Sequence, residues 1–245
     1  MNEIQQFYDE NSYKNWKVVL GEKMHYHTGV VGAGGDIFEN TVKEISTLLE
    51  ENSSVLDCGC GWGGPARYFI KNKNCDVTGV TISQKQYESI SDFNVILDDM
   101  NHFIPSEFYD YAIFIESLTH MENPKQIIEN LSSKVKNIII KDYIRDESCP
   151  IGKNEEWNMH FRTKKDFYDI FVNTEYEIDF YKQTKPIESM NNLRLSAEQW
   201  LNNLNKLPSQ FIFGQLELLK YHCYSILYGP QNTDINFVLL KASKK

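Results

Sequence analysis

The fold is decided by residues 54–70, which read SVLDCGCGWGGPARYFI. A short run typical of a β-strand, Ser54–Cys58, leads into glycines at positions 59, 61, 63 and 64, and a helix-forming stretch follows. Glycine lets the backbone turn tightly and pass close to a ligand without a Cβ clash. Because so many glycines cost more backbone entropy than an ordinary turn requires, the pattern predicts a strand, a ligand-binding loop and a helix.

Gly59, Gly61 and Gly64 satisfy the G-x-G-x-x-G spacing of nicotinamide and flavin enzymes. That pattern also requires an acidic residue at the end of the next strand, to hold a ribose hydroxyl. The next predicted strand ends in Thr81, and the pattern gives Asp57 no role. A carboxylate before the glycines suits a ligand with a cationic amino-acid end better than a pyrophosphate. A nicotinamide enzyme remains an alternative.

Short β-rich runs alternate with amphipathic stretches, which is typical of βαβ units and a parallel sheet. The predicted strands are Ser54–Cys58, Asp76–Thr81, Asn94–Leu97, Tyr109–Ile115, Asn137–Lys141, Tyr176–Tyr181 and Ile235–Lys241. Helices are predicted over residues 36–51, 64–72, 83–91, 124–134 and 164–171, with further helical patterns over 195–204 and 211–227. We therefore expect an α/β fold with a seven-stranded, mostly parallel sheet and a late reversing strand.

The composition excludes several classes of partner. The chain has 245 residues, with 25 Lys and Arg against 34 Asp and Glu, and a formal net charge of −9. Such a surface repels phosphate backbones and anionic headgroups, so we expect no nucleic acid and no membrane insertion. The amino terminus does not read as a signal peptide. Five cysteines without the spacing of a disulfide framework favour a reduced, cytoplasmic setting.

Residues 56–64, LDCGCGWGG, resemble motif I of class I S-adenosylmethionine-dependent methyltransferases. Residues 79–86 (GVTISQKQ), 97–100 (LDDM) and 108–124 (FYDYAIFIESLTHMENP) resemble the branch that includes tocopherol, sterol and geranyl diphosphate C-methyltransferases and cyclopropane fatty-acid synthases. The resemblance implies S-adenosylmethionine as the cofactor. It implies a cofactor site made of Asp57, Gly59, Cys60, Gly61, Gly63, Thr81, Ile82, Gln86, Asp98, Asp99, Met100 and Glu116.

Glu116 and His120 follow the fourth predicted strand, at the edge of an open α/β sheet where ligands bind. Methyl transfer is an in-line displacement, so a protein mainly aligns donor and acceptor, and a base is needed only when the acceptor loses a proton. By resemblance, Glu116 steadies a cation or takes part in deprotonation, and His120 is a candidate general base. The structural alternatives are that Glu116 caps or pairs with the next helix and that His120 holds its loop.

The amino-terminal residues 24–29, MHYHTG, resemble the H-Y-x-x-G region of the same branch. The resemblance implies that Tyr26 and Gly29 line the methionine end of the donor. It also implies that Tyr13 or Trp16 forms part of a lid.

We expect residues 1–35, 143–162 and 184–227 to form the acceptor pocket, and aromatic residues concentrate in these segments. The substrate-binding candidates are Tyr13, Trp16, Tyr26 and His160, although single aromatics also suit a core. His25 and His27 have no third ligand at a suitable spacing, so we expect no metal site.

These observations predict one domain over residues 1–245. It has an N-terminal lid (1–35), a Rossmann-like core (36–183 and 228–245) and a helical insertion (184–227) before the last strand. The resemblance implies transfer of a methyl group from S-adenosylmethionine to a small-molecule acceptor, a specialised metabolite, on carbon or nitrogen rather than oxygen. The alternatives are a lipid-modifying enzyme similar to cyclopropane synthases and a noncatalytic S-adenosylmethionine-binding scaffold. A homodimer is left open.

Overall fold

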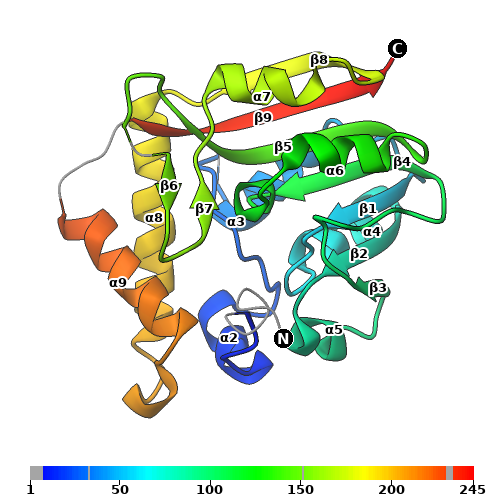
Figure 1. Ribbon diagram of the computed structural model, residues 1–245. Coiled ribbons are helices and arrows are strands. Elements are labelled where there is room, and N and C mark those ends of the chain that lie inside the picture. The colour runs from blue at the N-terminus through cyan, green and yellow to red at the C-terminus, as the bar shows by residue number, and fades with distance from the viewer. Residues whose placement is uncertain (1–7, 33, 151, 230–233) are drawn as a thin grey trace.

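The computed structural model describes residues 8–32, 34–150, 152–229 and 234–245. Its main sheet has seven strands in the order β3-β2-β1-β4-β5-β9-β8 (Figure 1). The strands are β1 (Ser54–Cys58), β2 (Asp76–Thr81), β3 (Asn94–Leu97), β4 (Tyr109–Ile115), β5 (Val135–Arg145), β8 (Tyr176–Gln183) and β9 (Ile235–Lys244). Residues 1–7 and 33 of the predicted lid, and residues 230–233 of the predicted core, lie outside the described residues.

The sheet is parallel except at its last strand. β1 pairs in parallel with β2 and with β4, β2 with β3, and β4 with β5. β9 lies antiparallel between β5 and β8. The α/β fold with a mostly parallel sheet of seven strands and a late reversing strand is therefore confirmed.

Helices cover both faces of the sheet, which explains why its strands are apolar on both sides. α3 (Ile37–Ser46) and α4 (Gly64–Lys73) pack on one face, and α6 (Pro124–Leu131) and α7 (Lys164–Phe171) pack on the other. Along β4 the side chains alternate between these two cores, with Ile113 in the first and Phe114 in the second. α5 (Gln84–Ser89) connects β2 to β3.

A third apolar cluster lies outside the sheet. It joins α2 (Tyr13–Leu20), α8 (Pro186–Leu204) and α9 (Gln215–Tyr228), with a short 3-10 turn, η2 (Ser209–Phe211), before α9. Figure 1 shows α8 and α9 beside the sheet, with α2 below the sheet and next to their lower ends. We call the group of α2, α8 and α9 the cap. Among the described residues, no helix has the length and apolar character needed to cross a membrane.

α8 begins at Pro186, nine residues before the helical pattern predicted from Leu195. The early turns were missed because their inward side is polar: Ser189, Asn192 and Ser196 are all buried. Asn192 Oδ1 accepts from the Val31 amide at 2.9 Å, and Ser196 Oγ accepts from the Gly29 amide at 2.9 Å. α8 therefore uses hydrogen bonds, not an apolar stripe, to hold the extended residues 28–31.

The small hairpin of β6 (Lys153–Asn154) and β7 (Met159–His160) was not predicted from the sequence. It pairs antiparallel and forms a separate two-stranded sheet. β7 lies against η1 (Leu118–His120), the turn that follows β4. The hairpin therefore brings Trp157 and Met159 close to the carboxyl ends of the strands.

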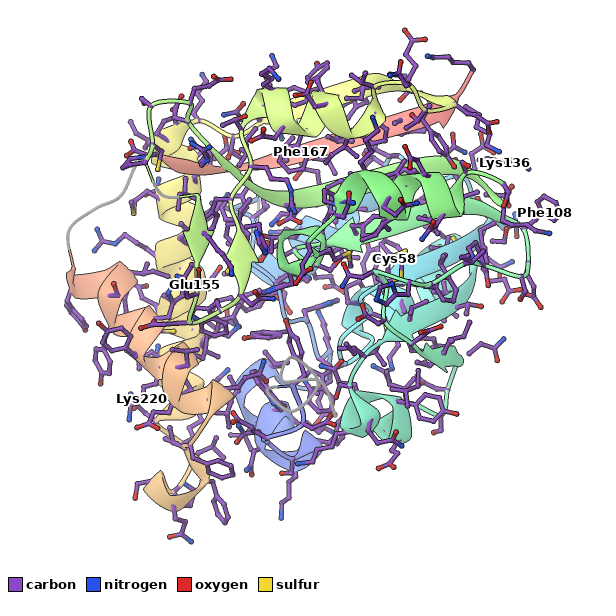
Figure 2. All side chains as sticks on the ribbon, viewed as in Figure 1. Cys58, Phe108, Lys136, Glu155, Phe167 and Lys220 are labelled. Carbon is purple, nitrogen blue, oxygen red and sulfur yellow. The ribbon has the colours of Figure 1, made fainter. Side chains whose placement is uncertain are left out.

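Figure 2 shows two phenylalanines in contrasting settings. Phe167 on α7 is 1% exposed within the sheet core, whereas Phe108 before β4 is 71% exposed. We expect Phe167→Ala to lower the free energy of unfolding by about 3–5 kcal/mol, because it leaves a cavity. The matched control Phe108→Ala should change it by less than about 1 kcal/mol. Urea unfolding followed by circular dichroism measures both, and equal losses would contradict the packing described.

Candidate functional site

A cavity lies at the carboxyl ends of β1, β2 and β4, between the sheet and the cap. β2 and β3 lie on one side of β1 and β4 lies on the other, so the strand order reverses at β1, and such switch points form binding crevices. In Figure 2, Phe108 and Lys136 mark the amino ends of β4 and β5, at the edge of the molecule farthest from Lys220 on α9. The cavity therefore occupies the side of the sheet that faces the cap.

The glycine loop between β1 and α4 forms one wall of the cavity. The Gly59 and Cys60 amides both donate to the Val80 carbonyl at 2.9 Å, which fixes the loop across β2. Gly59 and Gly61 have φ values of +81° and +53°, which disfavour any residue with a Cβ. A Cβ on Gly59 would lie 2.7 Å from Ser117 Cβ, whereas one on Gly61 would meet nothing within 4 Å. Gly61 thus faces open space where a ligand can approach the backbone.

Asp57 lines the cavity just before this loop and is only 2% exposed. Its Oδ2 has no hydrogen-bond partner among the described residues. Burial raises the pKa of the Asp57 carboxyl to about 7. An unpaired buried carboxylate costs free energy that a cationic ligand would recover.

At the end of β2, the Thr81 hydroxyl donates to Gln86 Oε1 at 2.6 Å and accepts from the Ser83 amide at 3.1 Å. This bond fixes the Gln86 amide, whose nitrogen carries the donors. Asp98 follows β3, and its amide donates to the Thr81 carbonyl at 3.0 Å. Asp98 and the half-buried Asp99 both line the cavity. The sheet therefore brings the second and third predicted cofactor segments to the same wall.

Glu116 is the most densely bonded side chain of the site. Its carboxylate accepts from the Thr28 amide at 3.0 Å, from Thr28 Oγ1 at 3.1 Å and from the Tyr143 hydroxyl at 3.0 Å, and it forms a buried ion pair with Lys141. Burial alone would raise the pKa of Glu116, but the positive charge of Lys141 and the hydrogen bonds hold it below its usual value. Glu116 has a φ of +50°, and this network holds that strained backbone. It is therefore ionised and ties residue 28 to the sheet.

His120 lies on η1 and lines the same cavity. Its Nδ1 is 3.1 Å from the Trp157 carbonyl oxygen. Since a carbonyl only accepts, Nδ1 carries the hydrogen and Nε2 keeps the lone pair of the neutral ring. Burial lowers the pKa of His120 to about 4, so the ring is neutral near pH 7. Tyr8 packs edge to face against it, with ring centroids 6.1 Å apart.

Two charged residues that sequence reasoning did not assign to the site hold the His120 turn in place. Arg162 is 9% exposed, and its guanidinium donates to the Leu118 carbonyl at 3.0 Å and to the Met121 carbonyl at 2.7 Å. Asp142 accepts from the Thr119 amide at 2.8 Å. Both residues are distant in sequence from the turn, so only the folded chain reveals their role.

The predicted site residues mostly share this one cavity. Those on its wall are Asp57, Gly59, Cys60, Gly61, Thr81, Ile82, Gln86, Asp98, Asp99, Met100, Glu116, His120 and Tyr26. Gly63 does not line it but forms the N-cap of α4, with a φ of +78°. Gly29 does not line it either, since its amide is bonded to Ser196.

Three of the predicted substrate residues are not on the cavity wall. Trp16 is fully buried in the cap, with its ring 4.7 Å from that of Tyr26 and 6.2 Å from that of Trp62. Tyr13 packs 5.7 Å from the ring of Trp62. Because Tyr26 and Trp62 do line the cavity, Trp16 and Tyr13 support the wall from behind.

His160, the remaining substrate candidate, is half-buried on β7 and does not line the cavity. Its carbonyl accepts from the Thr119 hydroxyl at 3.2 Å. Sequence reasoning also missed lining residues, namely Tyr8, Met24, Trp62, Tyr143, Gln215 and His222. Gln215 and His222 could have been found from the sequence, because they are seven residues apart in a predicted helix and therefore lie on one face of it.

His25 and His27 are buried, with ring centroids 5.3 Å apart. Burial lowers the pKa of His25 to about 4 and that of His27 to about 3, so both rings are neutral near pH 7. Within the described ranges, no group of three or more His, Cys, Asp or Glu side chains could hold a metal ion.

The buried setting of His120 predicts its titration. The unfolded chain should protonate its histidines near pH 6.5, whereas the folded His120 has a pKa of about 4. The stability gained from keeping the ring neutral is therefore complete above about pH 6.5 and declines as the pH falls toward 4. Nitrogen-15 NMR should find the His120 ring neutral, with its hydrogen on Nδ1, from pH 8 to pH 5. The same protein in urea is the control, and a folded pKa near 6.5 would contradict the burial described.

The comparisons with known proteins agree with this geometry. Residues 36–177 match a family model described as a methyltransferase domain. The chain is 34% identical over 136 residues to (S)-tetrahydroprotoberberine N-methyltransferase of Eschscholzia californica, a match that covers 51% of this chain and 37% of that enzyme. The chain thus spans well under two thirds of the length of that relative.

Two solved structures share the fold across nearly the whole chain. Coclaurine N-methyltransferase bound to N-methylheliamine and SAH superposes with a TM-score of 0.77 and 16% identity, covering 96% of this chain and 80% of that chain. The cyclopropane synthase MmaA2 from Mycobacterium tuberculosis has a TM-score of 0.76 and 16% identity, covering 99% and 98%. Because the family model matches more than half of its length, this chain belongs to the methyltransferase domain family.

Proposed function

We propose that this chain transfers the methyl group of S-adenosylmethionine to the nitrogen of a small amine. The observation that carries the proposal is the placement of His120. This neutral base lines the same cavity as the glycine loop and the unpaired Asp57 carboxylate. The family membership and the N-methyltransferase names of the relatives described above support it.

The residues on the wall fit S-adenosylmethionine, which supplies an electrophilic methyl group on a positively charged sulfur. The orphaned Asp57 Oδ2 would accept from the amino group of its methionine end, and the open space at Gly61 would let the ligand contact the loop backbone. Gln86, held by Thr81, would donate to the ribose, while Asp98, Asp99 and Met100 would hold the adenine edge. A net acidic wall also suits a cationic ligand.

His120 acts as the general base. An amine attacks only with a free lone pair, so Nε2 takes a proton from the nitrogen and, because burial disfavours the charged ring, passes that proton on to solvent. The bond from Nδ1 to the Trp157 carbonyl leaves Nε2 as the proton acceptor. Arg162 and Asp142 fix the turn that carries the ring, and the surrounding cap excludes water from the reaction.

Glu116 has a positioning role in this proposal and does not accept the substrate proton. Its oxygens already receive hydrogen bonds from Thr28 and Tyr143 as well as the ion pair with Lys141. Through Thr28 it holds the neighbouring Tyr26 and His27, which line the cavity. The N-terminal segment and the helical insertion together serve as the lid over the acceptor. A cytoplasmic location remains a prediction.

Donor binding is tested at Gly61. Gly61→Val should weaken binding of S-adenosylhomocysteine about 100-fold or more, equivalent to about 2.7 kcal/mol, because the side chain fills the space beside the loop. Gly35→Val is the matched control, since Gly35 also has a positive φ and open surroundings but does not line the cavity. Isothermal titration measures both. Unchanged affinity in Gly61→Val would remove the loop from the donor site.

The base is tested at His120. His120→Ala should lower kcat about 100-fold or more at pH 7, with S-adenosylhomocysteine affinity unchanged within about threefold. The loss should shrink as the pH approaches the pKa of the amine itself, because deprotonation then occurs in solution. Turnover is followed by the mass gain of one methyl group on the fastest amine of a panel, with the exposed His102→Ala as control. A wild-type rate in His120→Ala would refute the base.

A further inference from the structure

α9 presents one mixed stripe to the cavity. Gln215, Leu219, His222 and Ile226 all line the cavity, at spacings of four, three and four residues. An α-helix brings residues at these spacings to one face. The other side of α9 carries the exposed Tyr221, Tyr224 and Tyr228. The inward stripe is therefore the part of α9 that meets a ligand.

Gln215 is the polar anchor at the start of this stripe. Its side chain is 2% exposed, and its Nε2 has no partner within the described part of the chain. Its backbone amide donates to Glu10 Oε2 at 3.0 Å, which fixes the first turn of α9. A buried amide hydrogen without an acceptor is unfavourable, and a ligand oxygen would satisfy it. Gln215 thus selects for a hydrogen-bond acceptor in the ligand.

His222 supplies a second polar group on the same stripe. Seven residues separate it from Gln215, which is about 10 Å along a helix. Its ring packs edge to face with that of Trp157, at a centroid distance of 5.7 Å. Burial lowers the pKa of His222, so the imidazole is uncharged near pH 7. The stripe therefore offers two uncharged polar side chains, Gln215 and His222, about 10 Å apart along the helix.

Aromatic side chains flank this stripe. Trp157 and Trp200 both line the cavity. Trp200 stacks on Phe38 with centroids 5.4 Å apart, and Tyr26 meets it edge to face at 6.1 Å. A ring held by such packing presents a fixed apolar surface. These rings are suited to hold a flat ring in the ligand.

The charge of the cavity discriminates against anionic acceptors. Its charged lining residues are Asp57, Asp98, Asp99 and Glu116, and no Lys or Arg lines it in the described ranges. Residues 1–7, 33, 151 and 230–233 contain no Lys or Arg either. A phosphate or carboxylate on the acceptor would thus find no Lys or Arg on the described wall to pair with.

We propose that α9, Trp157 and Trp200 form the acceptor subsite. This subsite binds an aryl amine that bears an uncharged oxygen substituent, and Gln215 donates a hydrogen bond to that oxygen. This inference rests on the proposed function. It adds the class of substrate and identifies Gln215 as the residue that recognises its oxygen substituent. Amines that carry phosphate or carboxylate are rejected by the same subsite.

The test uses four probes on the full chain saturated with S-adenosylhomocysteine. The probes are 2-(3,4-dimethoxyphenyl)ethylamine, 2-phenylethylamine, O-phosphoethanolamine and sarcosine, with Kd measured by isothermal titration. The dimethoxy compound should bind about tenfold more tightly than the unsubstituted one, the effect of one satisfied hydrogen bond. The two amines that carry a phosphate or carboxylate group should not bind at millimolar concentration. Binding of either one as tightly as the dimethoxy compound would overturn the inference without any variant.

Gln215→Leu should remove the preference for the dimethoxy compound, while 2-phenylethylamine and S-adenosylhomocysteine bind within about threefold of wild type. Gln126→Leu, the same change on the exposed face of α6, is the matched control and should retain the preference. An unchanged preference in Gln215→Leu would overturn the role of Gln215. If wild type binds S-adenosylhomocysteine but neither aryl amine, this inference alone fails. If it does not bind S-adenosylhomocysteine, the proposed function fails as well.

Discussion

The buried ion pair between Glu116 and Lys141 is the constraint on which the cavity depends. Their side chains are 7% and 5% exposed, and the Lys141 ammonium also lies 4.2 Å from the centre of the Phe237 ring. Removing one partner of a buried ion pair leaves an unpaired buried charge and lowers the free energy of unfolding by about 3–5 kcal/mol. Each of the two residues therefore requires the other. The pair connects the end of β4 to β5 and β9. Through Thr28, it also connects all three to the segment that precedes α3.

The extended residues 28–31 are held from three directions. The Thr28 amide donates to Glu116, the Thr28 carbonyl accepts from the Thr41 hydroxyl at 2.9 Å, and the Gly29 and Val31 amides donate to α8. With the Val30 amide donating to the Ile37 carbonyl, all four amides of this segment have partners although the residues belong to no helix or strand. This segment couples α3, α8 and the sheet, so the cap and the core share one cavity wall.

The cavity divides into two chemical halves. The half built by the ends of β1, β2, β3 and β4 carries the carboxylates, while the half built by the cap and the β6–β7 hairpin carries aromatic rings, Gln215 and His222. A cationic donor is favoured on the acidic side and a flat, uncharged ring on the other. His120 stands between them, since its turn follows β4 and its Nδ1 is bonded to the hairpin at Trp157.

Local patterns in the sequence predict the sheet and the loops at the carboxyl ends of its strands. The short β-rich runs and the glycines after Cys58 are local signals, and the structure follows both of them. Asp57 and Asp98 lie at the ends of strands, and Gln86 and His120 lie on the short helices that follow strands, where local pattern and position in the sheet coincide. The remaining features depend on contacts that form only in the folded chain. Lys141, Arg162 and Trp157 act on residues far away in sequence, and the polar inner face of α8 hides its first turns from periodicity. Trp16 and Tyr13 likewise became supports of the wall and not its surface, because burial depends on which distant side chains pack in front of them.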